Sequence, residues 1–140
     1  MNKKILSFLL CFLSISVFSQ SFDNESLKRD AEKGDEFSQF LLGLLYKNGQ
    51  GVQQSFLDAA EQFMAAASQG TGAACHELGK FYEAGFAYRH SYKKAAEWYR
   101  RGILFGEKRC VYSLAKLLTE SRVEKKGEED AGKMFEEAWA

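Results

Sequence analysis

Apolar residues return every three or four positions along most of the chain, the spacing that places them on one face of an α-helix. A glycine-rich turn at residues 49–51 interrupts this pattern, and a second periodic stretch then runs to Gly70. The pattern predicts helices at about 36–48 and 55–69, joined by a tight turn. The apolar positions of the first are Phe37, Phe40, Leu41, Leu44 and Leu45.

The same helical hairpin recurs with a step of 36 residues, which relates Gly34 to Gly70 and Gly106. Carried forward, the step predicts helices at about 71–84, 91–105, 107–120 and 127–140. Carried backward, it predicts an unpaired helix at about 24–33. The chain contains no proline and no strand pattern, so we expect an all-α solenoid of about seven helices. Because stacked repeats present an extended surface, this architecture favours a binding scaffold over a closed catalytic cleft.

The beginning of the chain differs from the rest. Lys3 and Lys4 precede an apolar run of about 14 residues, shorter than the roughly 20 of a membrane span, and small Ser19 follows. We therefore predict a signal peptide at 1–19, export to the periplasm or medium, and no stable membrane span after processing. The repeat domain is 20–140, comprising a half-repeat at 23–34 and repeats at 35–70, 71–106 and 107–140.

Charge gives little sign of a polyanionic partner. The chain carries 19 basic and 19 acidic residues, and the loss of Lys3 and Lys4 with the signal peptide leaves a small acidic excess. We expect no nucleic-acid binding from such a balance.

The repeat itself resembles a known family. The segment SQFLLGLLYKNGQGV, from Ser38 to Val52, is similar to the Sel1-like repeat, a relative of the tetratricopeptide repeat. The second unit, AACHELGKFYEAG, matches nearly as well, but lacks the Gly-x-Gly-Val turn, and the third departs further. The resemblance implies a helical adaptor, often bacterial, that binds another protein; it fixes neither the partner nor any catalytic residue.

Small residues inside the helices indicate close packing. A glycine within a helix costs about 1 kcal/mol relative to alanine, so we expect Gly43 and Gly79 to recover that cost by letting the partner helix approach. The residues assigned to repeat packing are Gly43, Tyr46, Ala59, Gly79, Tyr82 and Ala95.

Cys75 and Cys110 remain after processing, and an oxidising compartment permits a bridge between them. In cysteine-rich members of the family a second helix is stapled to the following first helix. Cys75 resembles one end of that staple, but the other end falls near Ala67, which has no thiol. A Cys75–Cys110 disulfide and two core-filling thiols are both open alternatives.

Two places are predicted to bind a partner. The second unit replaces the family's glycine turn with aromatic and basic residues, types enriched at interfaces, although the rings could instead pack back on the stack. In the third repeat Trp139 replaces the small Ala67 of the first, so we expect an exposed edge there and a weak homo-oligomer as one alternative. The candidate binding residues are Phe86, Tyr88, Arg89, Tyr92 and Trp139.

Catalytic chemistry has one weak signal. Ser91 with Lys94, and Ser113 with Lys116, match the Ser-x-x-Lys spacing of penicillin-recognising enzymes, but Ser-Asp-Asn and Lys-Thr-Gly are absent. The alternatives to an adaptor are therefore an envelope hydrolase of that type and a self-associating scaffold. We predict no catalytic residues, no cofactor and no metal site, since His76 and His90 are the only histidines and neither has a ligand set.

Overall fold

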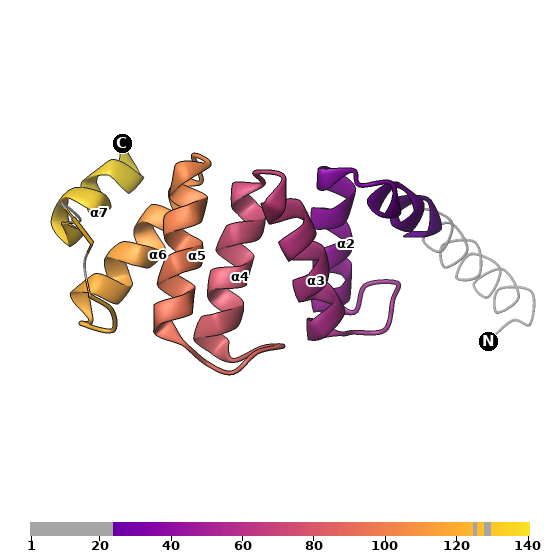
Figure 1. Cartoon of the computed structure of the whole chain (residues 1–140), viewed down its shortest axis with the longest axis horizontal. Helices are drawn as coiled ribbons and strands as arrows, with labels where there is room; N and C mark the ends of the chain where they lie inside the picture. The colour runs from indigo at the N-terminus through magenta and orange to yellow at the C-terminus, as the bar shows by residue number, and fades with distance from the viewer. Residues whose placement is uncertain (1–23, 125, 128–129) are drawn as a thin grey trace, which may run out of the picture.

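The computed structural model describes residues 24–140 apart from 125, 128 and 129, and only the backbone of residue 139. The predicted signal peptide lies outside the described residues. Residues 24–32 are helical and are followed by six further helices. The helices stand side by side in an elongated row, with residues 24–32 at one end and the C-terminus at the other (Figure 1). They are α2 (Glu36–Asn48), α3 (Phe56–Ser68), α4 (Gly72–Ala84), α5 (Tyr92–Leu104), α6 (Lys108–Thr119) and α7 (Ala131–Trp139).

The helix ends follow from local sequence chemistry. Asp35, Ser55 and Ser91 each accept a hydrogen bond from the backbone N–H three residues later, which satisfies a donor that the first turn leaves free. Gly49 and Gly85 end α2 and α4 at φ values of +66° and +75°, in the left-handed region that glycine adopts without strain.

Each repeat is a hairpin whose two helices pack against each other: α2 with α3, α4 with α5 and α6 with α7. One aromatic pair recurs in every hairpin at the same position. Ring centroids lie 5.8 Å apart for Phe40 and Phe63, 5.9 Å for His76 and Tyr99, and 5.4 Å for Tyr112 and Phe135. The first helices α2, α4 and α6 therefore present corresponding faces, and the predicted all-α repeat fold is confirmed in the described part of the chain.

The mid-helix glycines lie against these rings. A β-carbon on Gly43 would stand 2.6 Å from Cε1 of Phe63, and one on Gly79 would overlap the ring of Tyr99. Ala59 and Ala95 are fully buried in the same core clusters as Phe63 and Tyr99, respectively. Tyr46 and Tyr82 are half-buried and pack against these clusters. The absence of a side chain at residues 43 and 79 lets α3 and α5 approach the first helices.

Cys75 and Cys110 are free thiols, not the disulfide that the sequence left open. Both are fully buried, and Gly102 of α5 lies against both of them: a β-carbon on Gly102 would overlap Sγ of Cys110 and stand 3.2 Å from Cβ of Cys75. Burial raises the pKa of Cys75, and it raises the pKa of Cys110 to about 12. The two residues therefore fill core space around α5 as small apolar side chains.

Among the described helices, none is long and apolar enough to cross a membrane.

Candidate functional site

A groove of about 610 Å³ opens between the first helices α4 and α6. Tyr112 of α6 is 46% exposed there, and the buried Tyr99 of α5 and Ala138 of α7 complete the lining. The other residues of the groove are polar: His76, Lys80 and Glu83 from α4, and Lys108, Arg109, Ser113 and Lys116 from α6. An exposed aromatic ring surrounded by charged side chains is an arrangement common at protein interfaces.

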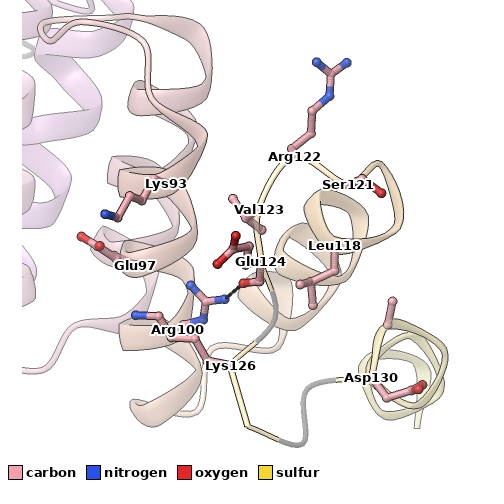
Figure 2. A pocket seen from close by; sticks show the side chains of 11 residues that line it. Lys93, Glu97, Arg100, Leu118, Ser121, Arg122, Val123, Glu124, Lys126 and Asp130 are labelled. Atoms are coloured by element: carbon pink, nitrogen blue, oxygen red, sulfur yellow. Dashed lines mark hydrogen bonds between the residues drawn. The ribbon is translucent and has the colours of Figure 1, made fainter.

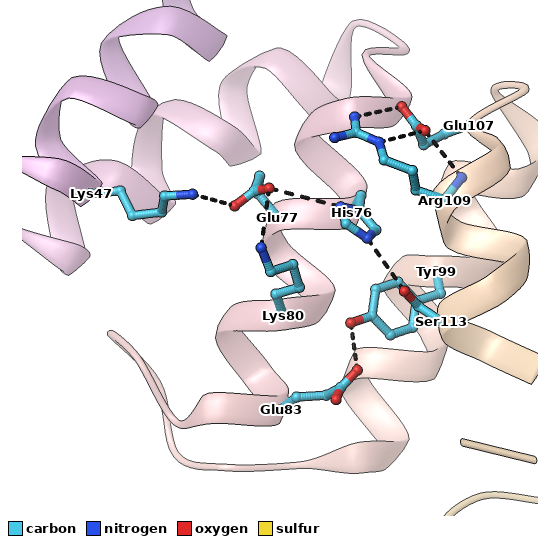
Figure 3. A network of polar contacts seen from close by, with 9 residues as sticks. All are labelled: Lys47, His76, Glu77, Lys80, Glu83, Tyr99, Glu107, Arg109 and Ser113. Atoms are coloured by element: carbon cyan, nitrogen blue, oxygen red, sulfur yellow. Dashed lines mark hydrogen bonds and ion pairs between the residues drawn. The ribbon is translucent and has the colours of Figure 1, made fainter. Parts of the chain in front are cut away.

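A chain of polar contacts joins the three first helices across this face (Figure 3). Nζ of Lys47, on α2, donates to Oε2 of Glu77, on α4, over 2.8 Å. Nε2 of His76, also on α4, lies 3.3 Å from Oγ of Ser113, on α6. Because each contact spans one repeat, the contacts fix the spacing and register of α2, α4 and α6.

Glu77 is the centre of this network and is buried. Its Oε1 lies 3.6 Å from Nζ of Lys80 and 3.8 Å from Nδ1 of His76. Burial by itself opposes ionisation, but the contacts with His76 and Lys47 outweigh it and lower the pKa of Glu77 to about 2. The carboxylate is therefore charged at neutral pH and holds positive side chains on two helices.

Two further acidic residues of this face are also engaged. The hydroxyl of Tyr99 donates to Oε1 of Glu83 over 2.5 Å, and burial together with that carboxylate raises the pKa of Tyr99. Arg109 donates from Nε and Nη2 to the two oxygens of Glu107, each over 2.9 Å, which lowers the pKa of Glu107 and raises that of Arg109. Lys108 and Lys116, both exposed, have no carboxylate partner among the described residues.

The aromatic residues of the turn after α4 pack onto the repeat stack. Phe86 stacks on Phe56 with centroids 4.4 Å apart and rings 3° from parallel, although 41% of it stays exposed. Tyr88 stacks on Tyr82 at 5.0 Å, and Tyr92 holds the guanidinium of Arg122 5.0 Å from its ring centre.

Exposed Arg89 lies in the same turn. The turn does not join the α4–α6 groove, and the role predicted for it in partner binding stays a prediction. The side chain of Trp139 lies outside the described residues.

The two Ser-x-x-Lys matches have different surroundings. Oγ of Ser91 caps α5 by accepting from the backbone N–H of Lys94 over 3.2 Å. Ser113 lies inside α6 and contacts His76 rather than standing at a helix terminus. The first match is thus explained by helix capping.

A second hollow of about 850 Å³ lies between α5 and the connection from α6 to α7 (Figure 2). Arg100 donates there to the backbone carbonyl of Glu124 over 3.0 Å. Acidic Glu97, Glu124 and Asp130 alternate with basic residues around it, so it has no predominant charge. Among the described residues, no group of three or more acidic, histidine or cysteine side chains is placed to hold a metal ion.

Sequence reasoning did not identify the α4–α6 groove. A signal was present, because His76 and Tyr112 share one repeat position and Lys80 and Lys116 share another. A structure was needed to show that these two positions face outward between neighbouring first helices.

Comparison with known proteins supports the repeat assignment. No family model and no curated protein matches this chain. Among solved structures, a Sel1 repeat protein from Oxalobacter formigenes superposes with a TM-score of 0.77 and 26% identity over 85% of this chain and 47% of the other. The protein c5321, a protective antigen present in uropathogenic Escherichia coli strains displaying an SLR fold, gives a TM-score of 0.76 and 29% identity over 86% of this chain and 26% of the other.

This chain thus spans about half and about a quarter of the length of these two relatives. The glycine positions that carry the sequence resemblance, Gly43 and Gly79, lie at contacts between its helices. The chain therefore has the Sel1-like repeat (SLR) fold, and its repeat pattern is similar to that of these relatives.

Proposed function

We propose that this chain is an exported helical-repeat scaffold that holds a segment of another protein in the groove between α4 and α6. The observation that carries the proposal is the exposed ring of Tyr112 in a groove of about 610 Å³, between Lys108 and Lys116, which have no carboxylate partner in the part of the chain that the structure describes. A half-exposed aromatic side chain in a concave site loses water-accessible apolar area when a partner covers it, which favours binding.

Export is supported by the sequence of residues 1–19, where two lysines precede a short apolar run and a small residue. An intact mass of the protein recovered from the cell envelope tests this part. A mass that lacks residues 1–19 supports export with cleavage after Ser19, and a mass that retains them contradicts it.

A photo-crosslinking amino acid at position 112 tests the groove. The matched control is the same amino acid at position 57, because Leu57 of α3 is exposed to a similar extent, 54% against 46%, and lies outside the groove. We expect a discrete protein adduct from position 112 and none from position 57. Equal labelling from both positions, or labelling from position 57 alone, would contradict the proposal.

One observation favours a second candidate, an acyl-transfer enzyme: Oγ of Ser113 lies 3.3 Å from Nε2 of His76 in the same groove. However, Oε1 of Glu77 is 3.8 Å from Nδ1 of His76, beyond hydrogen-bond distance. The backbone N–H groups around Ser113 are also committed to α6, so they form no oxyanion hole. A fluorescent penicillin and a fluorophosphonate probe separate the candidates, since only the enzyme would be labelled, in a manner abolished by Ser113→Ala.

A further inference from the structure

Resting on the proposed function, we propose that the partner segment is bipartite, with acidic residues in the α4–α6 groove and apolar residues on the exposed face of α2. The aromatic pair that joins each first helix to its second helix recurs with the repeat step, so the three first helices present one continuous surface. The chemistry of that surface changes from one end to the other.

The α6 end of the surface is positive. Lys108, Tyr112 and Lys116 are spaced four residues apart, so they form one row on α6 with the ring between the two ammonium groups. The neighbouring cations Lys80 and Arg109 contact Glu77 and Glu107, respectively. The surplus positive charge is therefore that of Lys108 and Lys116, which complements a segment carrying two or three carboxylates.

The α2 end of the same surface is apolar. Phe37 is 65% exposed, and Phe40 and Leu44 are half-buried. Two repeat steps later, the residues at these three positions all line the α4–α6 groove: Arg109, Tyr112 and Lys116. Because equivalent positions point the same way in each hairpin, the surface that carries Arg109, Tyr112 and Lys116 on α6 is apolar on α2. Glu36, at the α2 position equivalent to Lys108, is acidic and accepts a hydrogen bond from Thr71 over 3.4 Å, so acidic residues of the partner are favoured at the α6 end alone.

The middle of the surface, on α4, carries little net charge. The carboxylate of Glu77 is balanced by Lys47 of α2 at 2.8 Å and by Lys80. Neighbouring packed helices lie about 8–10 Å apart, and an extended chain rises about 3.3–3.6 Å per residue. An extended segment that crosses from α2 to α6 therefore needs about five residues between its apolar and its acidic parts.

A peptide fits this surface better than a polyanion. The surplus charge comes from two lysines on one helix. Glu83 lines the same groove, and Glu77 and Glu107 contact its cations Lys80 and Arg109. A nucleic acid would place many phosphates along the surface, near those carboxylates and over the apolar end, which offers them no counter-charge.

The test is fluorescence anisotropy with the mature protein recovered from the cell envelope and a labelled synthetic peptide. The peptide has Leu-Phe-Leu, a five-residue Gly/Ser spacer and Glu-Asp-Glu. We expect binding that weakens at least tenfold when the acids become Gln-Asn-Gln, and at least tenfold when Leu-Phe-Leu becomes Ser-Ser-Ser. A one-residue spacer should weaken binding similarly. Equal affinity for all four peptides would overturn the inference.

Charge reversal of the protein provides the second arm. Lys108→Glu with Lys116→Glu should abolish binding of the acidic peptide and allow binding of the same peptide ending in Lys-Arg-Lys. The matched control is Lys33→Glu with Lys93→Glu, two exposed positions outside the groove that change the net charge equally. If both double variants lose affinity for the acidic peptide equally, the inference is overturned. It is also overturned if a DNA oligonucleotide displaces the peptide from the wild type and from the control variant.

Failure of this inference differs from failure of the proposed function. If position 112 still crosslinks a protein partner while the charge-reversed variant binds that partner with unchanged affinity, the groove binds proteins and the bipartite chemistry is wrong. If position 112 crosslinks nothing, both proposals fail.

Discussion

The ring of Tyr99 occupies the space in which a β-carbon on Gly79 would stand. The same relationship holds one repeat earlier, where a β-carbon on Gly43 would meet the ring of Phe63. The repeat step therefore preserves a contact as well as a residue type. The aromatic residue of the second helix requires that the first helix lack a side chain at that point.

We expect Gly79→Ala to destabilise the fold. Alanine gains about 1 kcal/mol of helix propensity over glycine, but its methyl group overlaps a ring that is itself fully buried. Overpacking of this kind costs about 1–3 kcal/mol, so the overlap should outweigh the gain. Urea unfolding of the variant measures the difference.

The control for Gly79→Ala is the same substitution combined with Tyr99→Leu. Removal of the ring opens the space, so the two changes should couple, and Gly79→Ala should cost less in the Leu background. An equal cost in both backgrounds would show that the ring does not determine the effect.

Much of the fold could be predicted from the sequence because the repeat step and the helix signals agree. The helix predicted at 36–48 is observed as Glu36–Asn48, bounded by the cap at Asp35 and the left-handed Gly49. The helix predicted from 127 instead begins at Ala131, since Asp130 caps it and Gly127 has a φ of +63°. Glycine at residue 127 marked a turn, not a helix start.

The groove could not be predicted, because it depends on pairings between side chains about one repeat apart. Lys47 with Glu77 and His76 with Ser113 are separated by 30 and 37 residues, respectively. Neither pair matches the 36-residue step that revealed the fold. Similarly, composition identified the aromatic turn after α4 but not the stacking of Phe86 on Phe56.

The helix caps predict a contrast between Ser91 and Thr71. Ser91→Ala removes a capping hydrogen bond to the backbone N–H of Lys94 and should cost about 1 kcal/mol. Thr71 caps α4 without any side-chain hydrogen bond to the backbone, so Thr71→Ala should cost less. Thermal unfolding of the two variants compares them, and an equal loss would show that the cap contact of Ser91 contributes nothing.

Phe86→Ala is expected to destabilise the packing of the turn after α4 against α3 and α4. The ring stacks on Phe56 and meets Phe81 edge-on at 5.8 Å, so its removal loses aromatic contacts and apolar burial across α3 and α4. Because 41% of the side chain is exposed, the loss should be about 1–2 kcal/mol, less than for a fully buried Phe. Arg89→Ala, an exposed position in the same turn, is the matched control and should leave the unfolding midpoint unchanged.

The two buried thiols should be inert in the folded protein. The thiolate is the form that attacks the disulfide of Ellman's reagent and releases its thionitrobenzoate, and burial both shields Cys75 and Cys110 and raises their pKa values. We expect no reaction of Cys75 or Cys110 at pH 8 under native conditions and reaction of both in urea. Rapid native reaction, or no free thiol after unfolding, would contradict the free, buried state.

Glu77 predicts a loss of stability in acid. Its pKa is about 2 in the folded protein, against an ordinary value of 4.5. The stability that its ionised form contributes is therefore complete above about pH 5 and is lost as the pH falls from there to about 2. A difference of this size corresponds to about 3 kcal/mol, measured as the change in the free energy of unfolding in urea across this window.

Glu77→Gln isolates this contribution from those of other carboxylates. The variant should be less stable at pH 7, because Lys47 loses the carboxylate that its Nζ contacts at 2.8 Å, and its stability should fall less steeply between pH 5 and 2. Glu137→Gln, an exposed position on α7, removes the same charge and should keep the wild-type acid profile. If Glu77→Gln and the wild type lose stability in parallel below pH 5, the carboxylate of Glu77 does not join the first helices in the way that its contacts indicate.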